Sequence, residues 1–375
     1  MNRLIITTLW LALLFAAPGW TQVRNITINT TSPEGQLLQQ AADEKDSSKK
    51  IALLEQFLTQ YPNHEAAGYV HLLLQGEYLK VNNWDKSIEH GQKAQAKAPD
   101  DLEIAHFLVK GVEGKGDPQM LVQMVEKAHD LAVKAKAKPK PADADDVDAW
   151  KRSVDFATQV DQYNQYALYE SAQKQTAPPN KLLLLDTLRK DFPGGQFDKQ
   201  LDALYVVIYQ QLGQTDKMVQ AAQGALAADP SNEGYLYLVG EALVGKGQPA
   251  EAETYGKKIL DALPAKPKPE SISDEEWTKR KNTYLGLAHW VIGRSLAGQD
   301  KFVPAHKELT AAATALKGNN EVLGGIYYYL GLSSAKLNRQ SEAVNYLTQS
   351  SKIAGPYQSY AADTLKKIRA ALAGR

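Results

Sequence analysis

The stretch GGIYYYLGLSSAKLNRQSEAVNYLTQS, residues 324–350, decides the fold of this 375-residue chain. It carries the small residue Gly331 in its first half and Ala343 in its second, with large apolar residues around both. Small residues on two successive helices let the backbones approach closely, and the larger side chains fill the gaps around that contact. The stretch therefore predicts a helical hairpin, with helices over 320–336 and 340–353.

The same pairing of a glycine with an alanine occurs in two earlier stretches. Gly240 is followed by Ala252, and Gly293 is followed by Ala305, at the spacing that separates Gly331 from Ala343. The six residues are predicted to form the packing contacts inside three helical hairpins.

Prolines that close helices recur at a similar interval. Pro230 and Pro264 are 34 residues apart, while Pro62 to Pro99 and Pro193 to Pro230 each span 37 residues. A period of this length is typical of stacked helix-turn-helix units.

A longer repeat becomes visible when the chain is shifted against itself by 131 residues. Tyr61-Pro62 then falls on Phe192-Pro193, and Gly114–Pro118 falls on Gly245–Pro249 without a gap. We infer that a block of about three hairpins was duplicated, as expected for a solenoid.

These units resemble the tetratricopeptide repeat, which has Gly at its eighth position, Ala at its twentieth, an apolar residue at its twenty-fourth and a small one at its twenty-seventh. The match is specific in the last third of the chain and near Pro230, whereas an earlier unit has Gln75 and Ser87 at the two small positions. The resemblance implies an all-α, TPR-like α-solenoid of about eight helical hairpins with a C-terminal capping helix.

Apolar periodicity and helix-ending residues predict seventeen helices along the chain. Their expected ranges are 33–44, 48–60, 65–80, 84–97, 101–114, 117–135, 147–173, 179–191, 197–212, 215–228, 232–245, 248–262, 274–297, 301–317, 320–336, 340–353 and 356–372. The expected organisation is a signal peptide at 1–21, a flexible tether at 22–32, hairpins at 33–136, a linker at 137–146, hairpins at 147–262, a linker at 263–273, hairpins at 274–355 and a capping helix at 356–375.

The N-terminus has the pattern of an export signal. Arg3 precedes an apolar run from Leu4 to Ala17, which is followed by small residues and is shorter than the roughly 20 residues that span a bilayer. Cleavage is expected near Gly19 or Thr21, with no stable membrane insertion of the mature chain. Because the chain has no cysteine, we expect a periplasmic or secreted bacterial protein.

Composition and motifs argue against several classes of function. Lys plus Arg and Asp plus Glu are both 43, so no net charge attracts nucleic acid. The glycine-rich run at 240–247 lacks the final Ser or Thr of a phosphate-binding loop, and the seven histidines form no metal-ligand spacing. We therefore predict no catalytic residues, cofactor or metal, and no enzyme activity.

The resemblance implies that the first helix of each hairpin lines a concave groove. Its fifth position is Tyr237, Trp290 and Tyr328 in the three clearest units, and its ninth position includes Glu241 and Arg294. The residues predicted to contact a protein or peptide partner are Tyr237, Glu241, Trp290, Arg294, Tyr328 and Lys336. Packing against the neighbouring helix is the alternative role for each aromatic residue.

The leading functional hypothesis is a non-catalytic scaffold of the bacterial cell envelope that binds a protein or peptide in this groove. One alternative is an envelope hydrolase or carbohydrate-binding protein on a helical-repeat fold. Another is an accessory factor in outer-membrane or envelope assembly, because the segment from Phe57 to His64 resembles repeats of such proteins.

Overall fold

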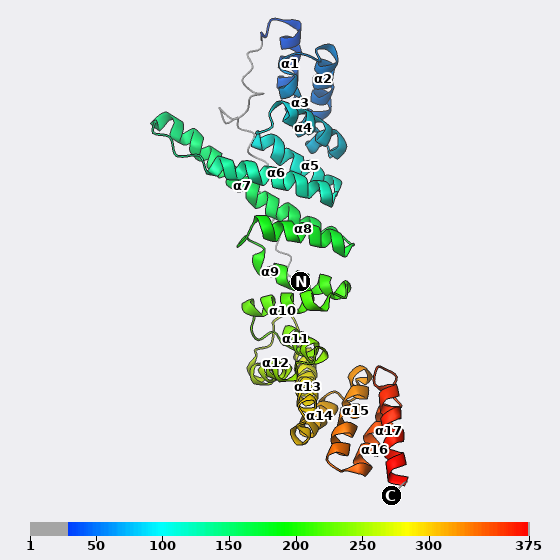
Figure 1. The fold of residues 1–375 in the computed structure, drawn as a ribbon. Helices are drawn as coiled ribbons and strands as arrows, with labels where there is room; N and C mark the ends of the chain where they lie inside the picture. The colour runs from blue at the N-terminus through cyan, green and yellow to red at the C-terminus, as the bar shows by residue number, and fades with distance from the viewer. Residues whose placement is uncertain (1–28, 374–375) are drawn as a thin grey trace. The chain divides into compact units, whose positions relative to one another are not determined.

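The computed structural model describes residues 29–373 and contains seventeen α-helices but no strand in that range. The predicted all-α class is therefore confirmed for the described chain, in which most helices pack on the next one along the chain, as in a solenoid (Figure 1). The predicted signal peptide at 1–21 and residues 22–28 of the predicted tether lie outside the described residues.

The chain divides into two compact units, and the first ends at Leu201. Each helix from α1 to α7 packs on the next one along the chain. The helices of the first unit are α1 Pro33–Asp43, α2 Ser47–Gln60, α3 Ala67–Lys80, α4 Trp84–Lys97, α5 Leu102–Lys115, α6 Pro118–Lys136, α7 Ala144–Lys174 and α8 Pro178–Asp191.

The second unit begins at Asp202, inside α9, which spans Asp198–Gln211. From α10 onward every helix packs on its successor. The remaining helices are α10 Thr215–Ala228, α11 Glu233–Gly245, α12 Pro249–Ala262, the 3-10 turn Leu263–Ala265, α13 Asp274–Gly298, α14 Phe302–Ala315, α15 Asn320–Lys336, α16 Gln340–Ser350 and α17 Gln358–Ala373.

Three helices of the duplicated block have the same bounds in both copies. Adding 131 to the bounds of α2, α3 and α4 gives those of α8, α9 and α10 to the residue. The turns match as well, because Asn82 and Gly213 both have left-handed backbone, with φ of 56° and 65°. Asn and Gly are the residues that accept this conformation most readily, so the turn is conserved although the residue differs.

The packing glycines lie against large apolar side chains. A Cβ added to Gly293 would meet Cγ of Leu309 at 2.6 Å, and one added to Gly331 would meet Cγ of Leu347 at the same distance. At Gly240 the nearest atom is Cγ1 of Val291, at 3.1 Å. Each paired alanine is fully buried, and these are Ala252, Ala305 and Ala343.

The unit that departs from the repeat pattern still forms a hairpin. Gln75 and Ser87 replace the two small residues, and both are fully buried between α3 and α4. The Ser87 hydroxyl donates to the carbonyl of Gln75 at 3.0 Å. The small residue is instead Gly91, where an added Cβ would lie 2.4 Å from Nε2 of Gln75. The close approach has moved by one turn of α4.

In the second unit the first helices of successive hairpins also contact one another. Besides packing on its neighbours in the chain, α11 contacts α13, α13 contacts α15, and α15 contacts α17. These four helices form a continuous inner row, on which the predicted groove residues are found.

Candidate functional site

The second unit contains an aromatic cluster built around one arginine. Its members come from α11, α13, α15 and the residues just before α17, so four successive layers of the inner row contribute. We refer to the following residues as the inner-row cluster: Tyr237, Glu241, Trp290, Arg294, Tyr328, Tyr329 and Tyr357.

Arg294 is the centre of this cluster. Its Nη1 donates to both carboxylate oxygens of Glu241, at 2.9 and 2.8 Å, which joins α13 to α11. The guanidinium carbon lies 4.7 Å from the ring centre of Trp290 and 5.8 Å from that of Tyr329. Burial disfavours the charged form, but the Glu241 carboxylate together with Tyr357 and Tyr329 outweighs burial and raises the pKa of Arg294. The cation is therefore fixed in place.

Trp290 forms the floor of the cluster. It is only 3% exposed and meets Tyr329 and Tyr357 edge to face, with ring centres 5.7 and 6.4 Å away. Gly325 makes room for it, because an added Cβ there would lie 2.9 Å from the far edge of the indole. Trp290 thus packs against neighbouring helices, which was the alternative to partner contact for each aromatic residue predicted in the groove.

The tyrosines are the more accessible part of the site. Tyr237 and Tyr328 are half-buried, and burial, reinforced by Glu241, raises the pKa of Tyr237. Tyr328 stacks on Tyr357 with ring centres 5.5 Å apart, and Tyr360 of α17 lies 6.4 Å from Tyr328. Tyr360 is 62% exposed, so it is the cluster's most open aromatic neighbour.

The last of the predicted groove residues, Lys336, is placed differently from the other five. Its side chain is exposed, and its ammonium group lies 5.8 Å over the ring of Phe302 on α14. The structure pairs Lys336 with the second helix of the preceding hairpin rather than with Arg294.

Sequence reasoning missed Tyr329, Tyr357 and Tyr360. Counting groove positions only within complete repeats leaves out the capping helix, which supplies Tyr360 and is preceded by Tyr357. The signal was present in the tyrosine-rich run at 327–329 and in the two tyrosines that follow 30 residues later.

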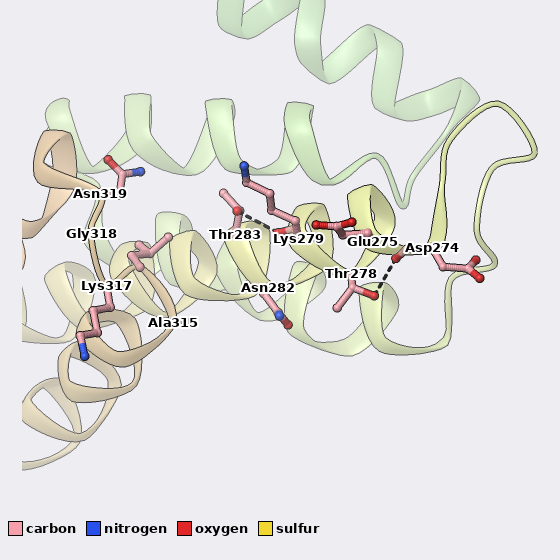
Figure 2. A pocket seen from close by; sticks show the side chains of 11 residues that line it. Asp274, Glu275, Thr278, Lys279, Asn282, Thr283, Ala315, Lys317, Gly318 and Asn319 are labelled. Atoms are coloured by element: carbon pink, nitrogen blue, oxygen red, sulfur yellow. Dashed lines mark hydrogen bonds between the residues drawn. The ribbon is translucent and has the colours of Figure 1, made fainter.

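A separate open cleft of about 750 Å³ lies beside the first turns of α13 (Figure 2). Its other wall is the loop between α14 and α15, including Lys317 and Asn319. The lining mixes carboxylates with ammonium groups, and Asp274 is already paired with Lys268 at 2.6 Å. Since its side chains are mostly exposed and of mixed charge, this cleft is a weaker candidate than the inner-row cluster.

Between residues 29 and 373, no group of three or more His, Asp or Glu side chains is placed to hold a metal ion. Over the same range, every helix is too short or too polar to cross a bilayer.

In two successive hairpins the glycine at the eighth position contacts the leucine at the twenty-fourth, as Gly293 does with Leu309 and Gly331 with Leu347. This packing resembles that of the tetratricopeptide repeat. No family model matches the chain, and no curated protein matches it.

Solved structures with similar helical repeats include "MamA RS-1 ArsTM double mutant", at 16% identity over 50% of this chain and 93% of that chain, with a TM-score of 0.36. The P58(IPK) TPR domain is 12% identical over 92% of this chain and 99% of that chain, with a TM-score of 0.31. The APC/C hetero-tetramer Cut9-Hcn1 is 13% identical over 91% and 56%, with a TM-score of 0.36.

Proposed function

We propose that this chain is a non-catalytic scaffold of the bacterial cell envelope, which binds an extended segment of a partner protein along the inner row of the second unit. The observation that carries the proposal is the inner-row cluster, where tyrosines surround an arginine that is already held by Glu241. Tyr, Trp and Arg are the residues that contribute most often to binding hot spots.

The arrangement suits a peptide because the cluster is preorganised. The Glu241–Arg294 pair and the floor of Trp290 fix the aromatic side chains before a ligand arrives, so little side-chain entropy is lost on binding. The tyrosines offer apolar ring faces and hydroxyl groups together, which can pack on side chains and bond to a peptide backbone.

The way in which the cluster uses its carboxylate supports the proposed non-catalytic role. Glu241 accepts two short hydrogen bonds from Arg294. The guanidinium group of an arginine stays protonated in proteins. A carboxylate tied to a permanent cation is poorly suited to take up and release protons, which a hydrolase would require.

The envelope location in this proposal rests on the sequence. The positive residue, apolar run and small residues within 1–21 form a signal-peptide pattern, and the absence of cysteine fits a bacterial periplasm or secretion from it. Fractionation of the native cells tests this part directly, since the mature chain should appear in the periplasm or the medium. Recovery in the cytoplasm with residues 1–21 intact would contradict it.

Site-specific photo-crosslinking tests the groove. A photoreactive phenylalanine analogue at Tyr360, which is 62% exposed beside the cluster, should form an adduct with one partner protein in the native envelope. The same analogue at Val303 provides the matched control, because Val303 is 65% exposed but lies on α14, outside the inner row.

The outcomes separate the hypotheses. An adduct from Tyr360 that is missing from Val303 supports binding in the groove, and its identity shows whether the partner is an envelope-assembly protein. Equal adducts from both positions, or a polysaccharide in place of a protein, would overturn the proposal.

A further inference from the structure

The 131-residue repeat places a second set of groove residues in the first unit. Subtracting 131 from Glu241 gives Lys110, and subtracting it from Arg294 gives Tyr163. Lys110 lies on α5 and Tyr163 on α7, and these two helices contact each other as α11 and α13 do. The first unit therefore has residues of different chemistry at the equivalent positions.

Lys110 is held by aromatic rings. Its ammonium nitrogen lies 5.1 Å from the ring centre of Tyr163 and 5.8 Å from that of Phe107. The side chain is half-buried, and burial lowers the pKa of Lys110, an effect that Glu113 partly offsets. Two ring faces stabilise a cation, but each contributes less than a carboxylate in contact would.

The nearest carboxylate is engaged elsewhere. Glu113 accepts a short hydrogen bond from the hydroxyl of Tyr163. Among the described residues, no carboxylate lies within salt-bridge distance of the Lys110 ammonium, which contrasts with the close pairing of Arg294 and Glu241. A half-buried cation without an ionic partner favours an incoming anion.

A second observation points to the same place. His106 is 8% exposed, its ring meets that of Tyr163 edge to face at 5.0 Å, and its Nδ1 is buried without a hydrogen-bond partner. Tyr166, one turn along α7, is 46% exposed and lies 6.1 Å from Tyr163. The polar ring of His106 and the open ring of Tyr166 thus lie against Tyr163, the residue that contacts Lys110.

We propose that Lys110, with Phe107, Tyr163 and Tyr166, forms a second binding site, which takes an aspartate or glutamate side chain of an extended peptide. The ammonium would form a charge-assisted hydrogen bond with the carboxylate, while the exposed ring of Tyr166 packs on the neighbouring peptide residues. This site lies in the first unit and does not depend on the inner-row cluster of the second.

The test uses a fluorescent hexaglutamate peptide, acetylated at its N-terminus and amidated at its C-terminus, so that only side-chain carboxylates are present. Fluorescence anisotropy with the full mature chain should show binding that a matched hexaglutamine peptide lacks. Lys110→Met keeps the apolar stem on the rings and should weaken hexaglutamate binding about tenfold, the typical value of one charge-assisted bond. Lys110→Arg should retain binding.

Lys115→Met is the matched control, because it removes the same charge from the same helix. Lys115 is exposed and already paired with Asp85 at 2.7 Å, so its loss should leave hexaglutamate binding unchanged. Equal weakening by both methionine variants would overturn the proposal, since it would show only a nonspecific charge effect. Preference for a peptide that has a free C-terminus but no acidic residue would overturn the choice of a side-chain carboxylate.

Discussion

At the scale of single residues, Gly293 at the eighth repeat position is required for close packing within its own hairpin. Gly293→Ala places a methyl group 2.6 Å from Cγ of Leu309, a buried side chain, and 3.2 Å from the backbone nitrogen of the same residue. We expect a loss of about 1–3 kcal/mol in the free energy of unfolding, which is typical of overpacking a core. Urea denaturation followed by circular dichroism measures it.

Gly245→Ala is the control for this prediction. Gly245 closes α11, and an added Cβ would meet nothing within 4 Å. Alanine there should be neutral or stabilise by up to about 1 kcal/mol, because it restricts the unfolded chain. Equal losses from the two substitutions would contradict the packing explanation, because only the methyl group at position 293 meets a neighbouring side chain.

A histidine pair makes the first unit sensitive to acid. Nδ1 of His71 lies 2.9 Å from Nδ1 of His90, and Nε2 of His90 lies 3.1 Å from the carboxylate of Glu55. Burial and then the neighbouring His90 and Lys93 lower the pKa of His71 to about 4, although Glu55 opposes the shift. In the second copy the two histidine positions are Asp202 and Ala221, so this feature belongs to the first copy alone.

The depressed pKa gives a stability prediction with a definite sign. Between pH 6.5 and 4 the unfolded chain binds more protons at His71 than the folded chain does. The contribution of His71 to the free energy of unfolding is therefore complete above pH 6.5 and is lost as the pH falls to 4. We expect a loss on the order of 1–2 kcal/mol, after allowance for solvent screening.

His71→Gln should make the fall in urea midpoint between pH 7 and pH 4.5 shallower. Part of the dependence of the urea midpoint on pH should remain, because burial also lowers the pKa of His90 and of His106. An unchanged slope in the variant would mean that His71 titrates normally in the folded chain.

The candidate site could be anticipated from the sequence only in part. Repeat counting identified Tyr237, Glu241 and Arg294, which the structure brings together, because helix periodicity fixes which positions share a face. It did not distinguish the buried Trp290 from the more open tyrosines, since exposure depends on whether the next layer has a glycine such as Gly325.

At the scale of elements, the helices themselves were predictable. Each observed bound lies within three residues of its expected value, because prolines and capping side chains mark the ends. Examples are Asp117 before Pro118 and the capping box in which Ser273 and Glu276 bond to each other's backbone. The larger differences occur at α7, which begins at 144 rather than 147, and at α16, which ends at 350 rather than 353.

The segment between α12 and α13 is tied down by contacts that its composition did not reveal. Lys266 donates to the Glu233 carboxylate at 2.8 Å and to the carbonyl of Ser231 at 3.0 Å. Glu233 is buried at the start of α11 and also pairs with Arg280 at 2.7 Å. Proline-bearing stretches of mixed charge are usually solvated spacers. Here, however, Lys266 fixes the segment to the buried carboxylate of Glu233.

Lys266→Met should therefore loosen this segment. We expect faster hydrogen exchange of the backbone amides in 265–273, with α11 and α13 still folded because Arg280 continues to pair with Glu233. Lys268→Met is the control, since Lys268 pairs with Asp274, which is 91% exposed. The prediction fails if the two variants exchange alike.

At the scale of the whole molecule, each hairpin buries its apolar face mainly against its neighbours in the chain. The loss of one helix should therefore destabilise only the hairpins next to it. The last helix, α17, illustrates this, because its buried Ala361 and Leu365 cover Leu347 of α16. Packing of α17 extends to α15 and α16. The duplicated block was evident from the sequence because matched residues recur 131 positions apart.

The most direct test of the solenoid is hydrogen exchange on a chain that ends at residue 355 and so lacks α17. We predict that protection falls most in α15 and α16, falls less in α13 and α14, and is unchanged in residues 29–201. A uniform loss of protection across both units would show that the chain folds as one globular core, and would contradict the account.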